Sequence, residues 1–195
     1  HGLRRFGFHG ISHRIAIGTA ATELGAFPED LRILSLYLDD ECSAVAYANG
    51  RCVDVTTGIN ARAGLPSGVS AGSIDLAAVS FLLRTEDSSL AELDQLLNTE
   101  SGLLGLSGAS KELDEVFMES DKGDTRCQLA IRVLVQQLLK SVGGLVASMG
   151  GVDLMVFSGK HGVTSTRLRA MLCERLGYLG LHIDEHRNEL MRGTK

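Results

Sequence analysis

The periodicity of the apolar residues changes sharply along this chain, and that change limits the folds it can adopt. Residues 31–38, 42–48 and 51–57 are short alternating or continuous apolar runs, which is the pattern of β-strands. Asn49 and Gly50 separate the second run from the third, and this pair favours the positive φ angles of a type I′ turn. The three runs therefore predict an antiparallel meander.

After the meander the pattern becomes helical. Residues 124–149 carry a wide apolar stripe at three- and four-residue steps, which predicts the longest helix, with Asp124 as its N-cap. Residues 152–157 form a short apolar run that predicts a buried parallel strand. Shorter helices are predicted at 12–24, 73–84, 88–97, 110–119 and 164–176. A meander followed by helices and a parallel strand predicts an α/β layer fold.

The remaining segments have weaker patterns. Glycine and serine are frequent in 61–72, 102–108 and 158–162, so we expect loops there. A last short strand is expected at 179–183. The expected N-caps of the shorter helices are Ser12, Ser88 or Ser89, Ser110, and Thr164 or Ser165.

Composition excludes several classes of partner. The 19 basic and 24 acidic side chains give a net charge of −5, which argues against a nucleic-acid partner. No apolar run approaches the ~20 residues of a membrane span, so no membrane association is expected. Four cysteines without a CxxC pair predict reduced thiols in a cytoplasmic protein. Because the chain begins at His1, we expect it to be part of a longer protein.

Several segments resemble, in order and spacing, the signatures of the acetate and propionate kinases. Residues 4–13 (RRFGFHGISH) are similar to the family's RRYGFHGTSH, and residues 101–108 (SGLLGLSG) to its SGLLGISG. Shorter similarities occur at 49–54, 71–75, 149–153 and 157–165. The resemblance covers nearly the whole chain and implies the C-terminal domain of a two-domain kinase.

The implied fold is a ribonuclease-H-like domain of the actin-like ATPase superfamily. Residues 1–30 would form the signature segment and a helix, and residues 31–195 the kinase domain, with a homodimer formed through this domain. The implied reaction moves the γ-phosphoryl group of ATP, with Mg²⁺, onto a short-chain carboxylate such as acetate or propionate, giving an acyl phosphate. The implied catalytic residues are His9 and His13, and the implied nucleotide-binding residues are Gly58, Gly159, Lys160 and Gly162.

This sequence departs from the family at its phosphate-binding segments. The family's HLGNG turn is replaced by residues 37–41 (YLDDE), so both glycines are lost and three carboxylates are gained. A carboxylate ~4 Å from a phosphate charge is repelled by about 4 kcal/mol at an effective dielectric of 20. Ser70 stands at the family's catalytic arginine and has no guanidinium, and residues 160–164 (KHGVT) alter the GIGEN loop. We therefore expect phosphoryl transfer to be impaired or lost.

Two alternatives remain open at this point. The first is a non-catalytic module, derived from the kinase, that dimerises or holds a partner. The second is a metal-dependent hydrolase in which Asp39, Asp40 and Glu41, with Asp54, hold a divalent ion. Asp54 and Asp75, which match the family pattern, are also read as a strand-end residue and a helix cap.

Overall fold

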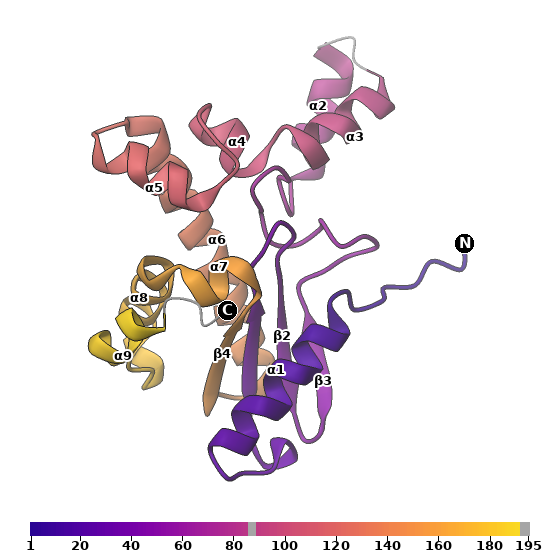
Figure 1. Cartoon of the computed structure of the whole chain (residues 1–195). Helices are drawn as coiled ribbons and strands as arrows, with labels where there is room; N and C mark the ends of the chain where they lie inside the picture. Colours follow the sequence, from indigo (N-terminus) through magenta and orange to yellow (C-terminus); the bar gives the residue numbers. More distant parts are fainter. Residues whose placement is uncertain (86–88, 192–195) are drawn as a thin grey trace.

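The computed structural model describes residues 1–85 and 89–191, which form a mixed four-stranded sheet with helices on both faces (Figure 1). The strand order is β3-β2-β1-β4. β1 (Ile33–Tyr37), β2 (Ser43–Ala48) and β3 (Arg51–Val55) are antiparallel neighbours, and β4 (Leu154–Ser158) runs parallel to β1. The predicted α/β class, with its meander and parallel strand, is confirmed.

The turn between β2 and β3 is the predicted one. Asn49 and Gly50 have φ angles of 53° and 74°, so both residues are in the left-handed region that this hairpin turn requires. β2 and β3 pair on either side of them, with a register irregularity between Ala46 and Tyr47. The Asn-Gly pair therefore fixes the hairpin locally.

The two faces of the sheet have different chemistry. Leu34 and Leu36 of β1 belong to the main apolar core, which the long helix α6 (Thr125–Met149) also lines. Ser35 is buried on the opposite face, where its hydroxyl lies 2.8 Å from Nδ1 of His13 in α1 (Gly10–Glu23). The strand alternation thus separates an apolar face under α6 from a partly polar face under α1.

Helix α6 is the main support of the core. Its N-cap is Asp124, as predicted, whose carboxylate accepts the Cys127 N–H at 2.8 Å. Among the described helices of at least 18 residues it is the one long and apolar enough, by length and composition, to cross a membrane. In this fold its apolar stripe packs on the sheet and on α4, α5 and α8, which accounts for its composition.

The other elements extend from this frame (Figure 1). α2 and α3 project beyond the sheet at the top of the view, while α4 and α5 lie against α6. α7, α8 and α9 follow β4 on the left of the view. The bounds are η1 (Pro28–Asp30), α2 (Leu76–Thr85), α3 (Leu90–Thr99), α4 (Gly102–Ser107), α5 (Leu113–Asp121), α7 (Gly159–Thr164), α8 (Thr166–Arg175), η2 (Gly177–Leu179) and α9 (Glu185–Leu190).

Three sequence expectations about local structure were wrong. The expected loop at 102–108 is instead helix α4. Its short glycine-containing sequence has little helix stability of its own, and packing against α6 supplies that stability. The expected loop at 158–162 contains most of α7. The expected strand at 179–183 is absent, because Leu179 and Leu181 pack individually against the core without a strand partner.

The helix caps were predicted with mixed success. Ser89 caps α3 in a capping box with Glu92, and Ser165 caps α8, whereas Ser88 lies outside the described residues. Ser12 does not cap α1, which begins two residues earlier, after His9 and without a side-chain cap. Ser110 likewise does not cap α5, because Glu112 holds the N-cap position of that helix.

Gly159, at the start of α7, packs tightly against the end of β1. Its φ is 77°, and a Cβ atom there would lie 2.6 Å from the Leu38 carbonyl oxygen. The amides of His161 and Gly162 donate to the same oxygen at 2.9 and 3.2 Å. A side chain at position 159 would therefore push α7 away from β1.

We predict that Gly159→Ala lowers the free energy of unfolding by about 2 kcal/mol or more, through left-handed strain and the clash with Leu38. Gly144→Ala, in α6 with nothing within 4 Å of the added Cβ, is the control and raises it by about 0.5–1 kcal/mol. Urea denaturation followed by circular dichroism measures both. Equal effects of the two variants would contradict the prediction.

Candidate functional site

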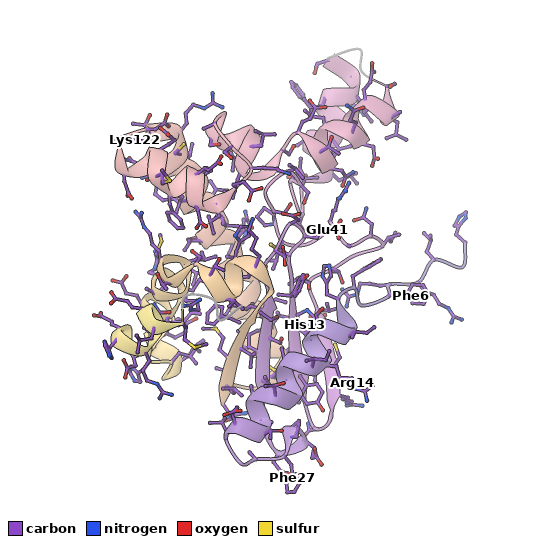
Figure 2. The ribbon with its side chains drawn as sticks, in the orientation of Figure 1. Phe6, His13, Arg14, Phe27, Glu41 and Lys122 are labelled. Atoms are coloured by element: carbon purple, nitrogen blue, oxygen red, sulfur yellow. The ribbon has the colours of Figure 1, made fainter. Side chains whose placement is uncertain are left out.

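The candidate site is a cavity at the carboxyl end of β1. Its volume is about 520 Å³, and its polar lining includes His9, Asp40, Glu41, Arg62, Lys111 and His161. Figure 2 labels Glu41 just beyond this end of the sheet and His13 near the start of α1 beneath it. The turn after β1, the start of α1, α7 and two loop segments therefore meet at one opening.

The two predicted catalytic histidines are tied to the sheet by serines. The Ser43 hydroxyl lies 2.9 Å from Nδ1 of His9 and 2.8 Å from Nε2 of His13, while Nδ1 of His13 lies 2.8 Å from the Ser35 hydroxyl. The His9 ring also stacks on Tyr37, with centroids 4.5 Å apart and planes at 25°. The sheet thus fixes the position of both imidazoles.

His13 is neutral in this setting. Its side chain is only 3% exposed, and burial, assisted by the proximity of His9, lowers the pKa of His13 to about 4. A neutral imidazole offers one donor and one acceptor, so it can satisfy the two serine hydroxyls that face it. The neutral ring of His13 therefore links the hydroxyls of Ser35 and Ser43.

The first acidic residue of the turn after β1 is engaged with α7. The Asp39 carboxylate accepts the backbone N–H of Lys160 at 3.0 Å and that of Asp40 at 3.0 Å. Partial burial raises the pKa of Asp39, but these two N–H donors outweigh it and the pKa lies below its usual value. Asp39 therefore stays ionised and connects β1 to the start of α7.

The last acidic residue of the turn faces two cationic or potentially cationic groups. Oε1 of Glu41 accepts Nε–H of Arg62 at 3.2 Å, and Oε2 of Glu41 lies 3.7 Å from Nε2 of His9. Lys160, by contrast, has its ammonium 2.8 Å from Glu112, which raises the Lys160 pKa. Arg62 and Lys111 line the cavity as cations, whereas Lys160 does not.

The remaining predicted site residues are placed at or near this region. Ser70 is buried, and its hydroxyl donates to the Arg62 carbonyl oxygen at 3.4 Å. Gly58 lies in the loop after β3, where a Cβ atom would come 2.8 Å from Cβ of Ala63. Gly162 is buried in α7. Ser70 is thus beside the cavity without presenting a charge to it.

The acidic residues do not gather into a metal site. Across residues 1–85 and 89–191, no group of three or more His, Cys, Asp or Glu is arranged to hold a metal ion. Asp54 instead pairs with Arg5 at 3.0 Å, and Asp75 accepts the Ala77 N–H at 2.7 Å at the start of α2. The geometry gives the hydrolase alternative no support.

The sequence did not single out several residues of this site. Ser35 and Ser43 had one available signal, since each is a polar position inside an apolar strand run. Arg62 and Lys111 lie outside the regular elements and belong to no motif, so no local signal identified them. His161 has a buried Nδ1 with no partner among the described residues.

The fold and the site together define the class of protein. The mixed sheet between helices matches the domains of acetate kinases in the actin-like ATPase superfamily. The model of the Acetokinase family matches residues 1–195. The chain belongs to the acetokinase family, and it is an acetate/propionate-kinase-like domain of a phosphoryl-transfer family.

Individual relatives support this assignment. The chain is 36% identical to the acetate kinase of Clostridium novyi over 195 residues, covering 100% of this chain and 49% of that protein. It is 37% identical to the propionate kinase of Citrobacter rodentium, covering 96% of this chain and 47% of that protein. The crystal structure of Porphyromonas gingivalis acetate kinase superposes with a TM-score of 0.95 at 35% identity, over 99% of this chain and 48% of that one. The chain therefore spans about half the length of the curated relatives it matches.

The burial of His13 predicts a pH-dependent stability. Its folded pKa of about 4 lies below its value of 6.5 when solvated, so the unfolded state binds more protons as the pH falls through this window. The contribution of neutral His13 to the free energy of unfolding is therefore present above about pH 6.5 and is lost as the pH falls towards 4. We expect His13→Gln to remove about 2 kcal/mol of the loss between pH 7 and pH 5.

Urea denaturation at the two pH values measures this difference. His182→Gln, at an exposed position, is the matched control and should keep the wild-type pH dependence. The prediction is wrong if His13→Gln loses as much stability between pH 7 and pH 5 as the wild type.

Proposed function

We propose that this chain is a domain of an acetate- or propionate-kinase-like protein in which ATP-dependent phosphoryl transfer is impaired. The named relatives are acetate and propionate kinases, so the ancestral reaction we infer is transfer from ATP, with Mg²⁺, to a short-chain carboxylate. Phosphoryl transfer depends on positioning and on neutralising phosphate charge. The proposal rests on how this chain uses the groups that would meet the phosphates.

One hydrogen bond carries the proposal. The backbone N–H of Lys160, at the start of α7, donates to the Asp39 carboxylate at 3.0 Å. Such N–H groups are natural phosphate donors, but here an internal anion already uses one. Asp40 and Glu41 line the same cavity and add negative charge. These carboxylates oppose the phosphates of ATP, and among the described residues no group of three or more His, Cys, Asp or Glu is arranged to hold its magnesium ion.

Other parts of the ancestral machinery are retained. We propose that His9 is the contact for a phosphoryl group and that His13 holds it in place through Ser43, given the 2.9 and 2.8 Å spacings. Gly159 and Gly162 remain the proposed nucleotide-loop positions, while Ser70 supplies no guanidinium. The histidines are retained while the phosphate donors are lost, which favours impaired transfer.

Calorimetric titration of Mg-ATP into the protein that carries this chain tests the proposal. We expect no binding, or a Kd above about 1 mM, because each turn carboxylate opposes the phosphates by an amount on the order of several kcal/mol. A micromolar Kd would overturn the proposed function.

A gain-of-binding variant sharpens this test. Combining Asp39→Gly, Asp40→Asn and Glu41→Gly removes three negative charges and restores the family's glycines, so it should tighten ATP binding at least about tenfold. The matched control combines Glu23→Gln, Glu119→Gln and Glu174→Gln, which makes the same change in charge away from the cavity and should leave ATP binding unchanged. Circular dichroism confirms that both triple variants fold.

A second candidate function is dimerisation. Leu3 and Phe6 of the N-terminal segment and Ile11 and Ile15 of α1 are between 64% and 79% exposed. Ile11 and Ile15 are four residues apart, so they lie on one face of α1. An exposed apolar strip of this kind supports self-association.

We expect a dimer in light scattering coupled to size-exclusion chromatography. Replacing Ile11 and Ile15 with Glu together should shift the dimer to monomer, whereas Leu129→Glu on α6, also an exposed apolar position, should not. A wild-type monomer at micromolar concentration would contradict this candidate, as would a double variant that stays dimeric.

A further inference from the structure

We infer that Arg62 and His9 form a binding site for a small oxyanion, and that Glu41 is an internal competitor which occupies it. The inference deepens the proposed function, since it concerns the same cavity, but it concerns phosphate-sized anions rather than ATP. It adds Arg62, which the sequence motifs did not identify, to His9 and Glu41, which they did.

The position of Glu41 defines the chemistry of the site. Its carboxylate lies between the Arg62 guanidinium, at 3.2 Å from Nε, and the His9 imidazole, at 3.7 Å from Nε2. A guanidinium beside an imidazole is a setting that binds carboxylate and phosphate oxygens. The position between Arg62 and His9 is therefore already occupied by an anion, the carboxylate of Glu41.

The internal anion is held weakly enough to be displaced. The Glu41 and Arg62 side chains are 36% and 41% exposed, and ion pairs at this exposure contribute little to stability. Among the described residues, the guanidinium makes one hydrogen bond to Glu41, through Nε, so its terminal nitrogens have no acceptor there. A ligand oxygen can therefore reach Arg62 with little loss of protein contacts.

A further cation lines the same cavity. Lys111 is part of the lining and has no ion-pair partner among the described residues. A bound oxyanion would give the Lys111 ammonium a charged partner.

The backbone places Arg62 close to the position of Ser70. The Ser70 hydroxyl donates to the Arg62 carbonyl oxygen at 3.4 Å, so the two residues are neighbours despite their separation in sequence. Arg62 lines the cavity together with Val69, the residue before Ser70. Arg62 thus supplies a guanidinium close to Ser70, whose own side chain has none.

The same geometry sets the size of the ligand. Asp39 and Asp40 line the cavity beside this position and would repel a long polyanion such as a triphosphate. A single phosphate, an acyl phosphate or a short carboxylate needs only the Arg62–His9 position. The ligand class is therefore a small oxyanion.

Calorimetry with inorganic phosphate, acetyl phosphate and acetate tests the inference on the whole protein. Phosphate should bind the wild type, Glu41→Gln should tighten binding roughly two- to fivefold, and Arg62→Ala should weaken it at least about tenfold. The variant with both changes should bind as weakly as Arg62→Ala. Arg62→Lys, which keeps the charge without the planar fork, should be intermediate.

A distant ion pair gives the matched controls. Glu119 and Lys122 pair at 2.7 Å on α5, and Figure 2 shows Lys122 at the far side of the molecule from Glu41. Glu119→Gln and Lys122→Ala should leave phosphate affinity unchanged. Circular dichroism establishes that each variant folds.

The outcomes separate this inference from the proposed function. Unchanged phosphate affinity in Arg62→Ala, or no gain in Glu41→Gln, overturns the Arg62–Glu41 site whatever ATP does. Micromolar ATP binding overturns only the proposed function. If only acetate binds in calorimetry, the ligand is a carboxylate. If phosphate and acetyl phosphate bind, the ligand carries a phosphoryl group.

Discussion

The hydrogen bond between the Lys160 N–H and the Asp39 carboxylate joins the turn after β1 to the start of α7, and the shape of the site depends on it. β1 and β4 are parallel neighbours, so their carboxyl ends meet at one edge of the sheet. Gly159 then allows α7 to approach the Leu38 carbonyl closely. The contact that closes this edge therefore uses the Lys160 N–H for a hydrogen bond within the chain itself.

Several polar residues in and around the cavity are satisfied by other groups of the chain. Asp39 is satisfied by backbone N–H groups, and Glu41 lies between Arg62 and His9. His13 is buried as a neutral ring between two serine hydroxyls. The fold thus pairs these charged and polar groups with one another.

The sequence predicted the elements whose signals are local. The Asn49–Gly50 turn, the Asp124 cap and the long apolar stripe of α6 each depend on residues within a few positions of one another. Helix α4 and the segment after α8 were misread, because their conformation depends on packing against α6 and the core. For the site, the motif contains His9, which lines the cavity, whereas Arg62 and Lys111 carried no local pattern.

By itself the sequence determined the class of fold, the family signatures and the loss of the phosphate-loop glycines, because these are patterns of neighbouring residue types. Only the tertiary structure decided which groups face one another. Asp39 meets Lys160 across 121 positions, and Arg62 meets Glu41 across 21. Such pairs form when strand register and helix packing bring distant segments of the chain together. No periodicity along the sequence encodes these contacts.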